Sequence, residues 1–325
     1  MLTAAQNDRA GGVLLGAACG DALGVPYEFA APPPAGQVPR MIGGGLGPYA
    51  PGEYSDDTQM AVCIAEVAAT GADLREPAAL DRIAANFVRW RAEGASDVGI
   101  QTSRVLAAIN GHELAGLGEA ARRAARALHE ETGRSAGNGS LMRTGVVALA
   151  YLGDPLAMVR AARAVSELTH FDVLAGDGCV LWCAAIQRAV LDGTFAGLRE
   201  GLDLIPAERR DRWAGWIDEA ERHPPAHFPN NGFVVTALQA AWSAISGTPE
   251  PAGDHLRNAL YAAVGAGNDT DTVAAIAGAL LGARWGASGV PQQWRDVVHG
   301  WERKRAADLI TLGLLTAGAE GFRAA

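Results

Sequence analysis

Apolar residues recur every three or four positions along most of the chain, which is the spacing of one face of an α-helix. Sustained alternation of apolar and polar residues between hairpin turns does not occur. Alanine, leucine, arginine and glutamate are also more prominent than β-branched and aromatic residues. The pattern therefore predicts an all-α fold of roughly a dozen or more helices. The main predicted helices span residues 9–19, 54–67, 80–90, 100–109, 120–129, 154–168, 173–191, 233–245, 255–264, 273–285, 294–299 and 302–316, with a further helix ending at residue 151 and a surface helix between 201 and 227.

Composition favours one compact domain over two. Hydrophobic residues make up 49% of the 325 residues and charged residues 19%, and no Ser/Gly-rich or Pro-rich linker is long enough to separate two halves. We therefore predict a single globular domain over residues 1–325. No heptad repeat or long exposed apolar stripe is evident, so we expect a monomer.

The charge balance disfavours nucleic acid as a partner. Lys and Arg number 27 against 36 Asp and Glu, a net charge of −9, and no basic run is long enough to follow a phosphate backbone. The N-terminal segment is too polar for a signal peptide, and no apolar run reaches the ~18 residues of a membrane span. We expect a cytoplasmic protein without membrane contact. Cys179 and Cys183 lie four residues apart in an apolar helix, and we predict that both are buried, without a disulfide or a metal.

Two predicted helices begin with clusters of carboxylates and hydroxyls, at residues 55–58 and 267–272. A helix start needs one such residue as its N-cap, so capping explains part of each cluster. Neighbouring carboxylates also repel one another unless a cation lies between them. Oxygen ligands without Cys or His favour magnesium over zinc, and the four aspartates would balance two divalent ions. We therefore predict a site for two Mg²⁺ ions, with Mn²⁺ as the alternative ion.

Three further polar positions each allow a structural and a functional interpretation. Asp97 precedes a predicted helix, where aspartate is a common N-cap. Residues 135–143 place glycines before a helix, which suits either a phosphate site or a tight turn. His170 follows a predicted helix and is either a buried core residue or a site residue.

Five motifs, taken in their order along the chain, resemble the ADP-ribosylglycohydrolase (ADP-ribosyl-acceptor hydrolase) family. The motifs are GDALG at 20–24, SDDT at 55–58, AGNGSLMR at 136–143, TH at 169–170 and GNDTDT at 267–272. The resemblance covers nearly the whole chain and is closest to the dinitrogenase-reductase-activating branch. It implies an all-α protein that binds two Mg²⁺ ions in a cleft at helix N-termini and removes ADP-ribose from modified side chains.

The resemblance also implies roles for individual residues. The implied metal ligands are Ser55, Asp56, Asp57, Asp269, Asp271 and Thr272. Ser55 stands where the family often has threonine, and it keeps the hydroxyl. Asp97 lies in a segment similar to the one that supplies a catalytic aspartate for arginine-linked ADP-ribose, and Glu28 falls where serine-acting branches place a functional glutamate. The implied substrate contacts are a diphosphate-binding segment, a histidine at the border of the pocket and an aromatic residue stacked on adenine: Gly137, Asn138, Gly139, Ser140, Leu141, Met142, His170 and Phe233.

These implied roles lead us to expect a Mg²⁺-dependent hydrolase of the N-glycosidic bond between ADP-ribose and a protein arginine. In this hypothesis the metals bind the ribose hydroxyls and a water molecule, and Asp97 handles the proton. The expected ligands are an ADP-ribosylated protein or ADP-ribose itself. The alternatives are hydrolysis of O-linked ADP-ribose (serine or O-acetyl-ADP-ribose), of an ADP-ribosylated nucleic-acid base or of a nucleotide diphosphate, and ADP-ribose binding without turnover.

Overall fold

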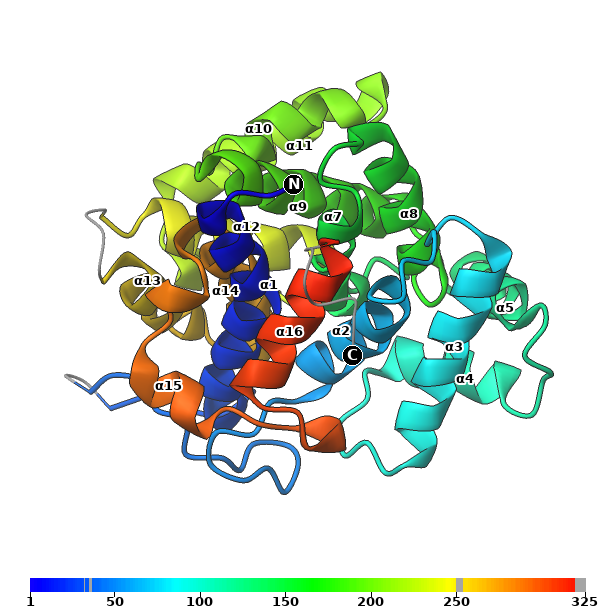
Figure 1. Ribbon diagram of the computed structural model, residues 1–325, viewed down its shortest axis with the longest axis horizontal. Coiled ribbons are helices and arrows are strands. Elements are labelled where there is room, and N and C mark those ends of the chain that lie inside the picture. The colour runs from blue at the N-terminus through cyan, green and yellow to red at the C-terminus, as the bar shows by residue number, and fades with distance from the viewer. Residues whose placement is uncertain (32, 35–36, 250–253, 319–325) are drawn as a thin grey trace.

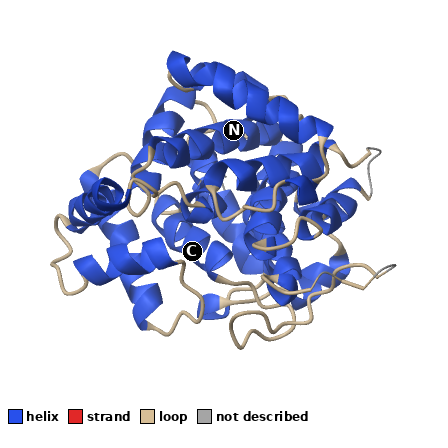
Figure 2. Ribbon diagram, turned by 180° about the vertical axis from the view of Figure 1, so that it is seen from behind, coloured by secondary structure: helices blue, strands red, loops and turns tan. Residues whose placement is uncertain are grey.

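The computed structural model describes residues 1–31, 33–34, 37–249 and 254–318, and these residues form helices joined by loops (Figures 1 and 2). Within those ranges the β-structure is limited to isolated bridges. The α-helices are α1 (Ala4–Gly24), α2 (Asp56–Ala68), α3 (Pro77–Ala92), α4 (Ile100–Ile109), α5 (Leu117–Thr132), α6 (Leu141–Thr144), α7 (Val147–Ala150), α8 (Pro155–Glu167), α9 (Val173–Asp192), α10 (Gly197–Glu200), α11 (Ala207–Arg222), α12 (Val234–Ser246), α13 (His255–Val264), α14 (Thr270–Trp285), α15 (Gln292–Val297) and α16 (Ala306–Thr316). Short 3₁₀ helices span Val25–Tyr27, Asn138–Ser140, Gly201–Leu204, Pro225–His227, Ala287–Gly289 and Trp301–Arg303. The predicted all-α fold is confirmed.

Two long helices, α1 and α14, form the centre of the fold and lie against each other (Figure 1). Every residue of α1 from Ala10 to Gly24 is buried, and so is every residue of α14 from Thr270 to Ala283. A helix that is apolar on nearly all sides belongs inside a domain. Polar groups within these stretches, such as Asp21 and Asp271, are therefore held away from bulk water.

Glycines spaced four residues apart on α1 allow its backbone to approach that of α14 closely. A Cβ atom on Gly16 would lie 2.2 Å from the carbonyl oxygen of Gly278, a distance that real Cβ contacts do not reach. The close approach therefore requires glycine at this position. The stripe consists of Gly12, Gly16, Gly20 and Gly24, which face Gly282, Gly278, Ala274 and Asp271 in that order. Its last pair sets the start of α14 directly against the end of α1.

Other helices surround this central pair (Figure 1). Helices α3, α4 and α5 pack together on one side, and α2 contacts both α3 and α1. Helix α9 packs against α8, α10 and α14. By length and hydropathy α9 is the one described helix that could cross a membrane, but 83% of that stretch is buried inside the domain. Asp177 and Arg188 interrupt the apolar residues of α9, so the uninterrupted apolar run sought in the sequence does not occur in this helix.

Most predicted helices are observed, and α4 and α13 match their predicted ranges. Helix α1 is longer than predicted because packing on α14 compensates for the low helix propensity of its glycines. The helix expected to end at Tyr151 is two short ones, α6 and α7. Their junction is tightened by an i→i+3 hydrogen bond from the Ala148 N–H to the Gly145 carbonyl, 3.3 Å. All four cysteines are buried and free, as predicted for Cys179 and Cys183.

Candidate active site

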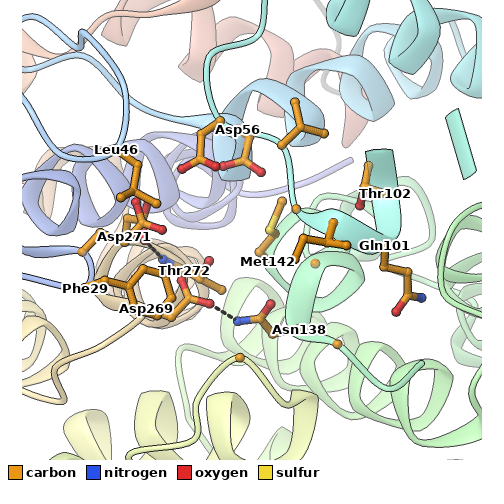
Figure 3. Close-up of a pocket in the computed structure, with 18 of the residues that line it drawn as sticks. Phe29, Leu46, Asp56, Gln101, Thr102, Asn138, Met142, Asp269, Asp271 and Thr272 are labelled. Atoms are coloured by element: carbon orange, nitrogen blue, oxygen red, sulfur yellow. Dashed lines mark hydrogen bonds between the residues drawn. The ribbon is translucent and has the colours of Figure 1, made fainter. Parts of the chain in front are cut away.

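The N-terminal ends of α2 and α14 meet beside α1 and bring the two acidic clusters together. Figure 3 shows Asp269, Asp271 and Thr272 grouped at the start of α14, with Asp56 facing them from α2. Carboxylate oxygens of Asp21, Asp57 and Asp271 lie within 4.8 Å of one another, and so do those of Glu28, Asp269 and Asp271. The two sets share Asp271, so this carboxylate belongs to both groups of candidate metal ligands.

Helix capping does not explain Asp269 or Asp97. Ser55 and Asp269 occupy the N-cap positions of α2 and α14, but neither side chain accepts a hydrogen bond from the first turn. Asp97 is not a cap either, because Gly99 occupies the N-cap of α4. Capping is therefore excluded for Ser55, Asp269 and Asp97, whereas Asp271 Oδ1 does accept a first-turn N–H, that of Thr272 at 2.9 Å.

No described cationic side chain pairs with these carboxylates, of which Asp21, Asp56, Asp57 and Asp271 are buried and Asp269 is half-buried. None of the ion pairs in the described part of the chain involves them. Burial and then repulsion from neighbouring carboxylates raise the pKa of Asp56, Asp57 and Asp271 well above the usual range. Buried charges are costly unless they are paired or bind a metal. Since the donors are all oxygens, the cluster fits hard divalent cations such as Mg²⁺ or Mn²⁺.

The Ser55 hydroxyl shows where a cation would be accommodated. Its Oγ lies 2.7 Å from Asp21 Oδ1, 3.1 Å from Asp57 Oδ2 and 3.2 Å from Asp271 Oδ2. A hydroxyl has one proton, so it donates to a single carboxylate, and the shortest distance is to Asp21. At the other two contacts, the Ser55 oxygen faces a carboxylate oxygen of Asp57 or Asp271 with no proton of its own left to donate. In addition, Asp57 Oδ1 is buried and has no hydrogen-bond partner among the described residues. These oxygens are free to bind a positive ion.

Asp21 is a site residue that the sequence reasoning did not identify as one. It projects from α1, and its Oδ1 accepts the backbone N–H of Ser55 at 2.8 Å and its hydroxyl at 2.7 Å. Its Oδ2 accepts the N–H of Thr58 at 3.0 Å and its hydroxyl at 2.7 Å. These bonds attach the first turn of α2 to α1. Asp21 is the one charged residue in the apolar stretch from Ala10 to Gly24, and this is the sequence signal that could have revealed its role.

Two asparagines hold the turn that precedes α14. Asn231 donates to the carbonyl of Gly267 at 2.8 Å and accepts the N–H of Asp269 at 3.2 Å. Asn138 donates to Asp269 Oδ2 at 2.7 Å, as Figure 3 shows, and to the carbonyl of Asn231 at 2.9 Å. Asn138, predicted as a substrate contact, thus also supports Asp269. Asn231 was not identified from the sequence as part of the site.

A cavity of about 470 Å³ opens in front of the carboxylates, which is a suitable size for a nucleotide-like ligand. The predicted site residues that line it are Glu28, Asp56, Asp97, Gly137, Asn138, Gly139, Met142, His170, Asp269, Asp271 and Thr272. Five others do not line it. Ser55 and Asp57 are buried beside Asp271, and Ser140 and Leu141 are buried in the core. Phe233 is half-buried, and its backbone forms a bridge with Gly137 at the edge of the cavity.

Glu28 and Asp97 form a hydrogen-bonded carboxyl pair in the cavity wall. Burial, followed by the charges of Asp97 and Asp269, raises the pKa of Glu28 to about 8. Burial also raises the pKa of Asp97, while its hydrogen bond to Glu28 opposes that rise. Two carboxyl groups in contact share a proton, and here Glu28 is the partner that holds it. The pair is therefore able to give or take one proton near neutral pH.

A strained backbone contact fixes the position of Glu28. The next residue, Phe29, has a φ of 45° and donates its N–H to the carbonyl of Asn268, 2.7 Å away. Asn268 has a φ of 57°, so both residues are left-handed, a conformation uncommon outside glycine. Strain of this kind is concentrated at functional sites. Here it ties the Glu28 segment to the turn that carries Asp269.

A family model, related sequences and a solved structure all indicate the same family. The family model described as ADP-ribosylglycohydrolase matches residues 2–320. ADP-ribosylarginine hydrolase Tri1 of Pseudomonas putida (strain GB-1) is 31% identical over 302 residues, which cover 90% of this chain and 74% of that protein. ADP-ribosyl-[dinitrogen reductase] glycohydrolase of Rhodospirillum rubrum is 28% identical over 300 residues, 89% of each chain. A solved structure described as an ADP-ribosylglycohydrolase-related protein complex superposes with a TM-score of 0.74 at 25% identity, covering 96% of this chain and 98% of that one. The chain therefore belongs to the ADP-ribosylglycohydrolase family.

Proposed function

We propose that the protein hydrolyses the N-glycosidic bond between ADP-ribose and an arginine side chain of a modified protein, with two Mg²⁺ ions bound in the site. The observation that carries the proposal is the convergence of two acidic helix starts on one cavity that also contains the Glu28–Asp97 pair. Relatives that act on arginine-linked ADP-ribose or on ADP-ribosylated dinitrogen reductase match most of the chain.

The ions would be held by Ser55, Asp56 and Asp57 from α2 and by Asp269, Asp271 and Thr272 from α14. When bound, they would polarise the ribose hydroxyls and lower the pKa of a water molecule. The protein itself holds these ligands rigidly, since Asp21 fixes the α2 side and Asn138 and Asn231 fix the α14 side.

Proton transfer belongs to the Glu28–Asp97 pair. Cleavage of the bond between ribose C1 and a guanidine nitrogen requires a proton on the departing nitrogen, and a carboxyl with a raised pKa supplies one near neutral pH. Glu28 holds the shared proton in the resting site, and Asp97 is placed to take it from Glu28 and pass it to the departing nitrogen. A guanidinium product is also cationic, which suits an acidic wall.

The opposite wall suits the diphosphate and the adenosine. Gly137 and Gly139 present backbone to the cavity, and glycine allows an anion to approach backbone N–H groups closely. Phe233 lies beside Gly137, where a base could stack on its ring. ADP-ribose would then extend from the glycine-rich turn to the carboxylates.

Release of ADP-ribose from ADP-ribosyl-arginine tests the proposal. The purified protein should release ADP-ribose, measured by chromatography with mass detection, with Mg²⁺ present and not after chelation. Asp97→Asn should abolish release while ADP-ribose still binds. AMP as the product would indicate a phosphohydrolase, and full activity of Asp97→Asn would refute the assignment of the proton to Asp97.

One observation favours a second candidate, hydrolysis of O-linked ADP-ribose. Glu28 lines the cavity and interacts with both Asp97 and Asp271, which places a glutamate next to the predicted metals. The same assay on ADP-ribosyl-serine and O-acetyl-ADP-ribose separates the two functions. Faster release from an O-linked substrate, lost in Glu28→Gln and kept in Asp97→Asn, would support the second candidate.

A further inference from the structure

One nitrogen of a deeply buried histidine faces the cavity without a protein partner. His170 is 2% exposed and lines the cavity, and its Nε2 makes no hydrogen bond to any residue that the structure describes. A Cβ atom on either Gly137 or Gly139 would lie 3.2 Å from this nitrogen, so the ring packs against the glycine-rich turn. Buried polar atoms normally have hydrogen-bond partners. Because this nitrogen is reached from the cavity, an acceptor atom of a bound ligand can supply its partner.

The other ring nitrogen is bound by a directional chain of hydrogen bonds. Thr169 Oγ1 lies 2.7 Å from His170 Nδ1 and 2.7 Å from Arg143 Nη2. A guanidinium donates only, so the threonine oxygen accepts from Arg143. The single hydroxyl proton then has Nδ1 as its acceptor, because otherwise it would be buried without a partner. Nδ1 is therefore unprotonated, and the ring proton resides on Nε2, the atom that faces the cavity.

Arg143 is not placed where it would stabilise the fold efficiently. It is fully buried and forms no ion pair within the described ranges. Its guanidinium lies 4.6 Å from the centre of the Phe87 ring, its Nη1 lies 3.6 Å from Met60 Sδ, and its Nε has no partner among the described residues. An unpaired buried cation is costly. Burial lowers the pKa of Arg143 to about 10, so it stays charged at neutral pH.

The positive charge has a direct consequence for the histidine. Burial, followed by the charge of Arg143, lowers the pKa of His170 to about 3. The imidazole is therefore neutral at neutral pH, and a neutral imidazole with an accepting Nδ1 is a donor at Nε2. Such a group recognises a hydrogen-bond acceptor, for example a phosphate or hydroxyl oxygen, without adding charge to the site.

We propose that Arg143 and Thr169 are positioning residues that hold His170 as the neutral Nε2–H tautomer, which donates to an oxygen of ADP-ribose beside the turn at residues 137–139. Arg143 acts through Thr169 and does not touch the ligand. The identity of the ligand rests on the proposed function, whereas the tautomer is a property of the protein alone.

Two matched substitutions at Thr169 test this chain of hydrogen bonds. Thr169→Val keeps the shape and removes the hydroxyl, and Thr169→Ser keeps the hydroxyl. Long-range ¹H–¹⁵N correlation spectra of protein labelled at histidine distinguish the tautomers, and His170→Gln identifies the His170 signals. The wild type and Thr169→Ser should show the Nε2–H form, and Thr169→Val should populate the Nδ1–H form. Thr316→Val, the same change at a buried threonine outside the cavity lining, should leave the His170 signals unchanged.

Binding of ADP-ribose provides the second measurement. By calorimetry, Thr169→Val should weaken binding about fivefold, equivalent to ~1 kcal/mol, as expected for one hydrogen bond, and Thr169→Ser should bind like the wild type. Arg143→Met, which removes the donor at the start of the chain, should weaken binding similarly without lowering the melting temperature. This variant keeps the test decisive if Thr169→Val does not fold.

The possible results separate the two proposals. An Nδ1–H tautomer in the wild type, or unchanged tautomer and affinity in both Thr169→Val and Arg143→Met, would overturn the positioning role. A Thr169-dependent Nε2–H tautomer in a protein that does not bind ADP-ribose would support the positioning role and refute the proposed function.

Discussion

Replacing Asp21 with asparagine separates the role of its charge from the role of its shape. The wild-type carboxylate accepts hydrogen bonds from the N–H and hydroxyl groups of both Ser55 and Thr58. An asparagine oxygen can keep the bonds of one residue, but its amide nitrogen then faces the N–H of the other. The substitution therefore removes one negative charge from the acidic cluster and leaves one buried N–H without an acceptor.

The two effects have opposite signs in the metal-free protein. Burial raises the pKa of Asp21 from 3.8 to about 6, which corresponds to ~3 kcal/mol against its ionised form at neutral pH. Removing the charge recovers this amount, and the unsatisfied N–H costs ~1–3 kcal/mol. The metal-free variant should therefore be unchanged or more stable by up to ~2 kcal/mol. Bound cations would offset the cost of the buried ionised carboxylate in the wild type, so the metal-loaded variant should be less stable by ~1–3 kcal/mol.

Urea unfolding in chelator and in saturating Mg²⁺ measures the difference. The gain in stability caused by Mg²⁺ should fall by ~3 kcal/mol in Asp21→Asn, and Mg²⁺ affinity by about a hundredfold. Asp177→Asn is the matched control, since Asp177 is equally buried but binds Arg163 and Arg209 outside the cavity lining. It should destabilise the protein equally with and without Mg²⁺. If Asp21→Asn also lowers stability equally in both conditions, Asp21 is a structural residue with no link to a cation site.

Two further predictions concern the central helices and the acidic cluster. Gly16→Ala places a methyl group against the backbone of α14 and should lower the free energy of unfolding by ~2–3 kcal/mol. The control Gly215→Ala, at an exposed position of α11 with open space around it, should raise the free energy of unfolding by ~0.5–1 kcal/mol. An equal effect of the two substitutions would contradict the packing argument. In chelator, the melting temperature should fall as the pH rises from 5 to 8.5. The folded protein keeps a proton on Asp21 up to a pKa of about 6 and a proton on Glu28 up to a pKa of about 8, whereas the unfolded chain loses both protons near pH 4. Saturating Mg²⁺ should flatten this slope, and a metal-free melting temperature that rises over this range would refute the raised pKa values.

The helices and the acidic clusters could both be predicted from the sequence, but for different reasons. Helical periodicity is a local signal, so α4 and α13 were placed correctly, and the resemblance grouped the aspartates that the fold brings together. Whether Asp269 or Asp97 is a cap depends on where each side chain points, which periodicity does not report. The structure was needed to exclude capping at both positions.

The residues that hold the site in place were harder to predict because their hydrogen-bond partners lie far from them in the sequence. Asp21 binds residues 34 and 37 positions away, and Asn231 binds the turn 36 and 38 positions away. The four-residue spacing of the glycines in α1 was present in the sequence, and it places them on one face of a helix. Their partner α14 lies more than two hundred residues further on, so the spacing alone did not identify the contact.

The close packing of α1 on α14 explains why the carboxylates cannot relieve their repulsion by moving apart. Contacts between backbones, as at Gly24 and Asp271, leave no flexible side chain to adjust between the helices. Asp21 then attaches α2 to the same rigid pair through backbone N–H groups. Helix N-termini offset part of the negative charge, but that effect is only ~0.3–1 kcal/mol for each carboxylate. The remaining repulsion has to be met by protons or by cations, so a scaffold that holds the ligands this rigidly is preorganised for metal binding.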